Sequence, residues 1–283
     1  MLTLAAQSLL APLLILQVGP NTAPDPRQEL DLRNRPPREA VREGRIEGPR
    51  PTSDFRLCLD QTQTDPARAA ANAERQLAQA SGQARSQPAH CLGLARSELG
   101  DFAGAQVAFT TARDAAPSEA TLYRARLGAL AGNAALANGA ADAASVLFAQ
   151  AQDDARDAGR TDLLAGILVD RARAEVSAGR EQNAVSILAS AREADPANAR
   201  AWLYSATLSR RQDDLAGAQE QIERAAQLSA DDPLVGLEAG LIAALSGRDD
   251  AARSSWQSVL ALAPGSAEAQ AASNYLAQLE ETP

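Results

Sequence analysis

Few residues in this chain have the chemistry of a catalyst. His90 is the single histidine among 283 residues, and lysine does not occur, so all 27 basic side chains are arginines. A phosphate-binding P-loop, a pyridoxal Schiff base and a serine–lysine pair each need the lysine amine. A zinc-protease motif needs two histidines, and no GxSxG or GxGxxG segment is present. We therefore expect no enzyme activity and no cofactor, and we interpret His90 as a structural residue.

Adjacent aspartates are the other candidates, because paired carboxylates can bind a cation or serve as acid and base. They occur at Asp153-Asp154, Asp213-Asp214, Asp231-Asp232 and Asp249-Asp250. Each pair falls at a predicted turn or helix end, where carboxylates cap free amides and oppose the helix dipole. No EF-hand spacing accompanies them. We interpret the pairs as helix caps and expect no metal site.

Two cysteines, Cys58 and Cys91, are too few for a zinc site without help from histidine. In an exported protein such a pair favours one disulfide. The two sulfurs would meet if the segment from Cys58 to Asp65 ran back along the helix predicted from Asp65-Pro66 to about Ala84. The alternative is two buried, reduced thiols.

Composition narrows the fold and the partners. The chain has 36 acidic residues and a net charge of −9, which argues against sequence-independent binding of nucleic acid. Apolar residues make up 45% of the sequence, aromatic residues only 3%, and alanine dominates the apolar set. Small apolar side chains favour closely packed helices over a thick sheet-based core, so we expect an all-α protein.

The N-terminal part differs from the rest. Residues 1–19 contain an apolar run, residues 9–16, of signal-peptide length, which predicts a signal or an uncleaved anchor and an exported, periplasmic protein. Membrane contact would then occur only through this segment. A mis-assigned start or a cytoplasmic hydrophobic tail is the alternative. Residues 20–53 are rich in Pro, Arg and Glu and are predicted to be a disordered linker, or a segment that folds on a partner. Residues 54–283 are predicted to form a helical domain.

Small residues recur in the helical part at a regular interval. Gly93, Gly132, Ala172, Ala206 and Gly240 follow one another at steps of 39, 40, 34 and 34 residues. A period of 34 residues is typical of a helix-turn-helix repeat.

The residues around these positions carry a family resemblance. The first full copy has Leu92-Gly93, Gly100, Phe102, Ala105, Phe109, Ala112 and Pro117. This pattern resembles the tetratricopeptide-repeat (TPR) family, of a bacterial exported type, over roughly residues 88 to 265. The resemblance implies an all-α, right-handed solenoid of about five helical hairpins plus N- and C-terminal capping helices. The second copy departs from the pattern in a second helix extended through Asp157, and the fourth has Asp213 where the others have a turn glycine.

Each repeat position has a physical role. Small residues let the two helices of a hairpin approach closely, and one large residue fills the space towards the next repeat. These large residues are Phe109, Phe148, Leu188, Ile222 and Trp256. Turn glycines at positions 100, 139, 179 and 247 suit a left-handed helix C-terminus, where a Cβ is costly.

The resemblance also implies a binding groove on the first helices of the hairpins. By register with the family, the residues facing or edging it are Arg173, Arg200, Thr207, Arg210, Arg211 and, farther along, Asn133. Arginines can grip a carboxylate with paired hydrogen bonds, so we expect an acidic segment or chain terminus as ligand. The family's lysine-based carboxylate clamp cannot form without lysine. The alternative is a solvated polar face.

We therefore expect a non-catalytic scaffold or assembly factor that binds a protein or peptide in the concave TPR groove. The alternative is an accessory or regulatory subunit of a cell-envelope enzyme or export complex. The sequence identifies neither the partner nor the oligomeric state, because TPR folds serve many functions.

Overall fold

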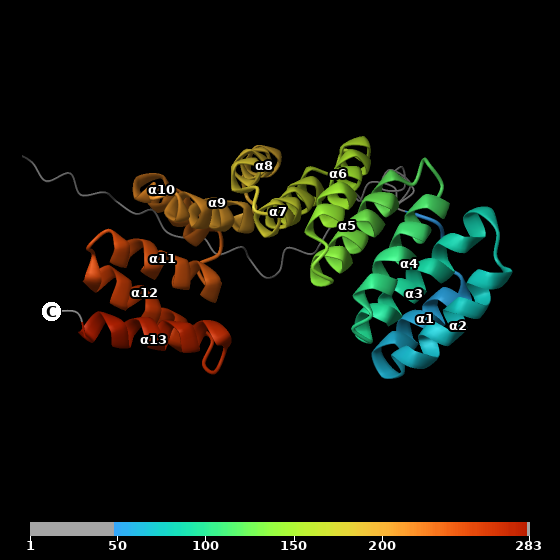
Figure 1. Ribbon diagram of the computed structural model, residues 1–283, viewed down its shortest axis with the longest axis horizontal. Coiled ribbons are helices and arrows are strands. Elements are labelled where there is room, and N and C mark those ends of the chain that lie inside the picture. The colour runs from blue at the N-terminus through green and yellow to red at the C-terminus, as the bar shows by residue number, and fades with distance from the viewer. Residues whose placement is uncertain (1–47, 282–283) are drawn as a thin grey trace, which may run out of the picture. The chain divides into compact units, whose positions relative to one another are not determined.

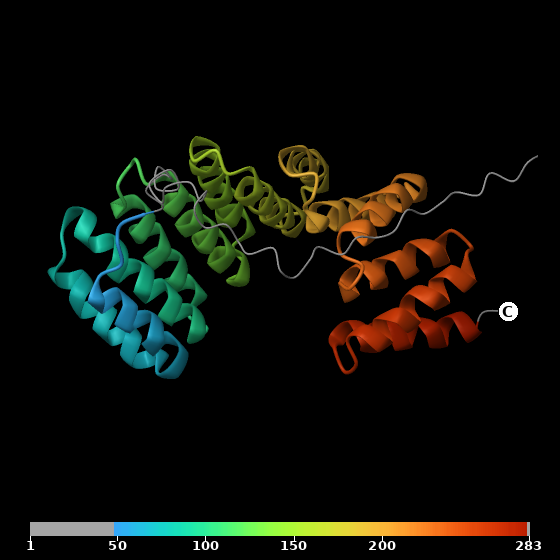
Figure 2. The same ribbon diagram turned by 180° about the vertical axis from the view of Figure 1, so that it is seen from behind.

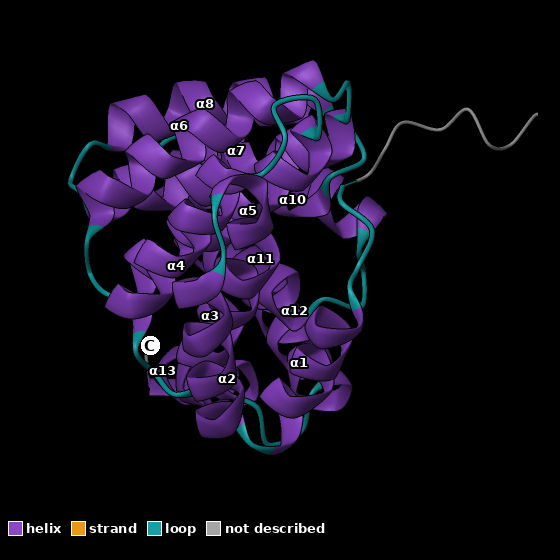
Figure 3. Ribbon diagram, turned by 90° about the vertical axis from the view of Figure 1, so that its right-hand side faces the viewer, coloured by secondary structure: helices purple, strands orange, loops and turns teal. Residues whose placement is uncertain are grey.

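The computed structural model describes residues 48–281, which belong to the compact unit Ile46–Pro283. The predicted signal-like segment and the predicted linker up to residue 47 lie outside the described residues. Within them the chain forms thirteen α-helices and one 3₁₀ helix, η3 (Gly82–Arg85), without a strand (Figures 1 and 3). None of the helices between residues 48 and 281 combines the length and apolarity needed to span a bilayer. The expected all-α class is confirmed.

The helices form consecutive hairpins. They are α1 (Ser53–Thr64) with α2 (Pro66–Gln79), α3 (Ser86–Glu98) with α4 (Phe102–Ala115), α5 (Thr121–Ala137) with α6 (Ala141–Asp157), α7 (Thr161–Ser177) with α8 (Glu181–Ala194), α9 (Ala199–Arg211) with α10 (Leu215–Leu228), and α11 (Pro233–Leu245) with α12 (Asp249–Leu262). The last helix is α13 (Ala267–Glu281). The five hairpins from α3 to α12 are those that the sequence predicts, and α6 extends to Asp157 as expected. The N-terminal cap is itself a hairpin.

Neighbouring hairpins stack through their helices. Each helix packs on the next one along the chain, and first helices also contact one another, as in the pairs α7–α9 and α9–α11 (Figures 1 and 2). This is the arrangement of a TPR-like solenoid, in which each repeat contacts only its neighbours.

A residue with a left-handed backbone conformation follows the first helix of each repeat. Gly100, Gly139, Gly179 and Gly247 have φ angles of 75°, 75°, 74° and 71°. Asp213 takes the same place in the fourth repeat with φ 61°, the only positive φ of a non-glycine residue in the described part of the chain. The turn therefore keeps its shape where the sequence has no glycine, because aspartate tolerates this region better than most residues.

Close contacts between a small and a large residue hold the two helices of several hairpins together. A Cβ added at Gly93 would lie 2.5 Å from the Phe109 ring, and one at Gly132 would lie 2.7 Å from the Phe148 ring. The five large residues predicted to fill the space towards the next repeat, Phe109, Phe148, Leu188, Ile222 and Trp256, are each at most 2% exposed. The predicted core positions are therefore confirmed.

The N-terminal hairpin is tied to α3 in two ways. A disulfide joins Cys58 of α1 to Cys91 of α3, with the Cα atoms 6.1 Å apart and both side chains buried. The Gln87 side chain accepts hydrogen bonds from the Thr52 amide and hydroxyl, both at 3.0 Å, and donates one to the Arg50 carbonyl at 2.8 Å. Residues 50–52, at the end of the predicted linker, are thus fixed against α3.

Two glycine-to-alanine substitutions test the close contacts. We expect Gly132→Ala to lower the free energy of unfolding by about 1–3 kcal/mol, because the added methyl group overpacks against Phe148. Gly166→Ala in α7 is the matched control, since nothing lies within 4 Å of a Cβ there. It should be neutral or stabilise the protein by up to about 1 kcal/mol through higher helix propensity. Urea denaturation followed by circular dichroism measures both, and equal effects would refute this packing account.

Candidate functional site

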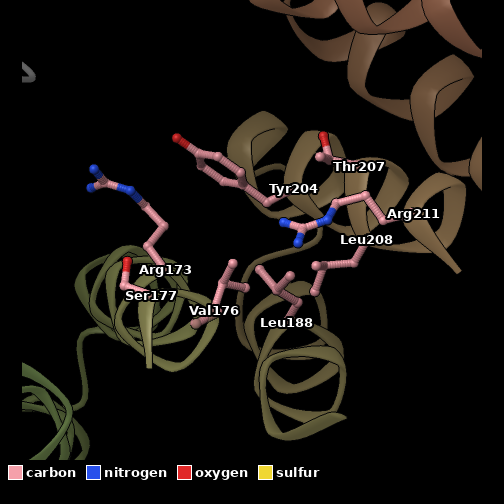
Figure 4. Close-up of a pocket in the computed structure, with 9 residues that line it drawn as sticks. Arg173, Val176, Ser177, Leu188, Tyr204, Thr207, Leu208 and Arg211 are labelled. Carbon is pink, nitrogen blue, oxygen red and sulfur yellow. The ribbon is translucent and has the colours of Figure 1, made fainter. Parts of the chain in front are cut away.

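A groove of about 260 Å³ lies between the first helices α7 and α9, with α8 beneath it (Figure 4). The residues that line it are Ala172, Arg173, Val176 and Ser177 of α7, Leu188 of α8, and Tyr204, Thr207, Leu208 and Arg211 of α9. Three of the predicted site residues, Arg173, Thr207 and Arg211, therefore come together here, although they lie on different hairpins.

The floor of the groove is apolar and its rim is polar. Leu188 and Leu208 are buried, and Val176 packs against the same hydrophobic cluster. In Figure 4 the guanidinium groups of Arg173 and Arg211 and the hydroxyl of Tyr204 lie on one side of this floor. The groove can thus accept an apolar side chain below and an anionic group above.

One carboxylate bridges two arginines beside the groove. Arg173 Nη1 donates a hydrogen bond to Asp170 Oδ1 at 3.0 Å, and Arg200 Nη2 donates to the same oxygen at 3.4 Å. The Arg200 guanidinium also lies over the ring of Tyr204, 5.8 Å from its centroid. Arg200 is therefore next to the groove without lining it, and Asp170 links α7 to α9.

The adjacent Arg210 and Arg211 point to different partners. Arg211 forms an ion pair with Glu181 of α8, and the two side chains are 44% and 32% exposed. Arg210 instead donates two hydrogen bonds to Glu238 of α11, at 2.6 and 3.3 Å, and these side chains are only 21% and 10% exposed. Arg210 therefore does not line the groove, and it connects α9 to α11.

One predicted site residue, Asn133, lies apart from the others. Asn133 is exposed on α5 and does not line the groove between α7 and α9. The Thr207 hydroxyl donates to the Leu203 carbonyl at 3.2 Å, so it remains able to accept a hydrogen bond from a ligand.

Sequence reasoning missed Tyr204 and Asp170. Tyr204 lies one turn before Thr207 on α9, and Asp170 one turn before Arg173 on α7, so helical spacing alone places each beside a predicted residue.

His90 has the surroundings of a structural residue. Its ring lies 5.1 Å from that of Phe55 and 5.7 Å from that of Tyr123, and His90 Nδ1 is 3.1 Å from the Tyr123 hydroxyl. Burial lowers the pKa of His90 to about 4, because the charged imidazolium is poorly solvated there. The ring is therefore neutral near pH 7.

Only some of the paired aspartates cap a helix: Asp249 and Asp250 lie in the first turn of α12, whose N-cap Arg248 makes no side-chain cap hydrogen bond. Asp214 and Asp232 cap α10 and α11 by accepting hydrogen bonds from the amides of Gly217 and Leu234, both at 2.9 Å. Asp154, by contrast, is buried and pairs with Arg113 at 2.8 Å and Arg124 at 3.3 Å, so the cap interpretation is wrong for this residue. In residues 48–281 no three His, Cys, Asp or Glu side chains group so as to hold a metal ion.

Charge is distributed unequally between first and second helices. The first helices α5, α7 and α9 carry seven arginines and three acidic residues. The second helices α4, α6, α8 and α10 carry four arginines and nine acidic residues. The groove between α7 and α9 thus belongs to a locally basic set of helices in a chain with a net charge of −9.

Comparison with known proteins identifies the fold alone. No protein-family profile matches the chain, and no curated protein matches its sequence. The similar solved structures include PilF of Pseudomonas aeruginosa, the quorum sensor NprR of B. thuringiensis in its apo form, and BtubC of P. vanneervenii. The match to PilF has a TM-score of 0.59 and a sequence identity of 15%, and it covers 80% of this chain and 96% of PilF. The match to NprR has a TM-score of 0.61 and an identity of 12%, and it covers 80% of this chain and 68% of NprR. The match to BtubC has a TM-score of 0.57 and an identity of 17%, and it covers 75% of this chain and 91% of BtubC. The TPR-like solenoid is therefore confirmed.

The two adjacent arginines should differ in their effect on stability. We expect Arg210→Ala to lower the free energy of unfolding by about 2–4 kcal/mol, because Glu238 loses its cation where water solvates it poorly. Arg211→Ala should cost less than about 1 kcal/mol, because its ion pair is exposed. Urea denaturation at pH 7 measures both. Adding Glu238→Gln to Arg210→Ala should recover part of the lost free energy of unfolding. If Arg210→Ala and Arg211→Ala lowered that free energy equally, the assignment of Arg210 as structural would be contradicted.

Proposed function

We propose that the protein is a non-catalytic interaction scaffold or assembly factor that binds an acidic segment of another protein in the groove between α7 and α9. The observation that carries this proposal is the combination of an apolar floor and an arginine rim on adjacent first helices. Stacked hairpins offer an extended surface on which such a groove is largely preformed, so binding does not need to order the site.

Charge supports an acidic partner. The guanidinium group presents several donors in a plane and matches a carboxylate better than any other side chain. Arg173 and Arg211 present such groups on the rim, and Arg200 adds a third beside it. The acidic second helices repel the same partner, so a negatively charged segment is directed towards α7 and α9.

Nucleic acid is a less suitable anion for this surface. A phosphate backbone requires a long, uniform track of cations, because each phosphate contact contributes through displaced counterions. The basic region here is limited to three first helices and adjoins second helices with nine acidic residues. A short acidic protein segment matches the size of this region.

The test is affinity capture with a groove variant and a matched control. The variant Arg173→Glu/Arg211→Glu reverses the rim, and the control Arg156→Glu/Arg224→Glu reverses exposed arginines on the second helices α6 and α10. Because the chain has no lysine, capture should not depend on amine-reactive crosslinkers. We expect partners of the wild type to be depleted at least about 10-fold with the groove variant, a loss of about 1.4 kcal/mol in binding, and to be retained with the control.

An unchanged set of partners with the groove variant would refute the proposal. Circular dichroism of both variants must show wild-type helix content, so that a loss of partners is attributed to the rim and not to unfolding.

The protein's place of action is a second part of the proposal: we place it outside the cytoplasm, in the periplasm. Support comes from the signal-like sequence of residues 1–19 and from the disulfide between Cys58 and Cys91, since oxidising compartments preserve such bonds. Alkylation of rapidly acid-quenched, fractionated cells with a maleimide mass tag measures the thiol state. We expect labelling only after reduction, in the periplasmic fraction. Free thiols in the cytoplasmic fraction would contradict this placement.

A further inference from the structure

The arginines beside the groove already hold a carboxylate of the chain itself. We propose that Asp170 is an internal competitor, whose charge and hydrogen bonds to Arg173 and Arg200 weaken the binding of a partner's carboxylate to the same arginines. This inference rests on the proposed function and adds two features to it: the partner must bring an apolar side chain together with its acidic group, and the chain itself weakens the binding.

Asp170 uses only a few of the hydrogen-bond donors of the two arginines. Arg173 and Arg200 both bond to one oxygen, Oδ1, at 3.0 and 3.4 Å, each through a single terminal nitrogen. Neither arginine forms the bidentate pair that makes such contacts strong. Most donors of both guanidinium groups therefore remain free for a ligand.

The charges around the groove are incompletely balanced. Glu181 offsets Arg211, whereas Asp170 alone faces both Arg173 and Arg200. One positive charge is thus left over at the rim, and it would become two if Asp170 were neutral. The Asp170 side chain is only 16% exposed, whereas those of Arg173 and Arg200 are 41% and 53% exposed, so the arginines face solvent more than the carboxylate does. A ligand can therefore reach the arginines from the solvent side.

The apolar floor is the reason that the partner must bring an apolar side chain together with its acidic group. The space of about 260 Å³ above Leu188 and Leu208 can bury an apolar side chain, with Val176 at its edge. Such burial favours binding, because it removes the apolar surface of a side chain like leucine from water. A segment that brings only carboxylates competes with Asp170 without this gain. A segment with leucine next to glutamate has both contributions, and this combination is the source of specificity.

A defined peptide tests the inference. The probe is a fluorescein-labelled synthetic 12-residue peptide with one leucine flanked on each side by two glutamates and otherwise glycine and serine, and its dissociation constant for the full chain is measured by fluorescence anisotropy. We expect Asp170→Asn to bind it about 5- to 10-fold more tightly than the wild type, because one competing charge is removed. The gain should shrink as salt increases.

Three matched variants serve as controls. Asp170→Glu keeps the charge and should not tighten binding. Asp142→Asn removes the exposed carboxylate that pairs with Arg180 on another hairpin, and should leave the dissociation constant unchanged. Arg173→Glu/Arg211→Glu should abolish binding. Peptides with glutamine for glutamate, or serine for leucine, should bind at least about 10-fold more weakly, a difference of about 1.4 kcal/mol.

The outcomes separate this inference from the proposed function. If Asp170→Asn binds the peptide equally or more weakly, while the rim variant abolishes binding, Asp170 positions the arginines and the competitor role is overturned, although the groove function stands. If the glutamate and glutamine peptides bind alike, or the leucine and serine peptides bind alike, or no peptide binds, the joint recognition of an acidic and an apolar side chain is overturned. The capture experiment then decides on the groove function independently.

Discussion

The close approach of a small residue on one helix to a large residue on the next is the contact on which the structure depends. Gly93 with Phe109 and Gly132 with Phe148 leave no room for a Cβ, so the two helices of each of these hairpins have one way to pack. The face of a first helix that is not used in this contact then has a defined direction. In the two hairpins that form the groove the small position is held by the buried Ala172 and Ala206, and α7 and α9 lie side by side and present Arg173 and Arg211 over a shared floor.

Burial decides which arginines stabilise the fold and which can bind a partner. Arg210 with Glu238, and Arg113 with Asp154, are mostly hidden from solvent and connect neighbouring hairpins. Removing one member of such a pair leaves a charge that water cannot solvate well. Arg211 forms an exposed ion pair and can exchange its partner at little cost. A chain whose only strong cation is arginine therefore uses the same side chain for cohesion and for recognition.

The sequence predicts the fold well because the fold depends on local signals. Recurring small residues, turn glycines and Asp213 mark the hairpins from α3 to α12, and the structure has them where the pattern predicts. The hairpin of α1 and α2 lacks this pattern and was expected only as a cap. The site is harder to predict, because adjacent helix positions differ in direction by about 100°. That difference separates Arg210 from Arg211. The carboxylates that pair with the predicted arginines, Glu181 and Glu238, come from other hairpins, so a single sequence does not reveal them.

Photocrosslinking from inside the groove shows whether a partner binds there. A photoreactive phenylalanine derivative in place of Thr207 would project from the rim, and the same residue in place of Val146, which is exposed on α6, would report the second-helix side. We expect position 207 to crosslink to an acidic segment of a partner, and this crosslink should be lost when the charges of Arg173 and Arg211 are reversed. Position 146 should give no crosslink to that segment. Crosslinks to the same partner from position 146 alone would contradict the assignment of the groove as the binding site.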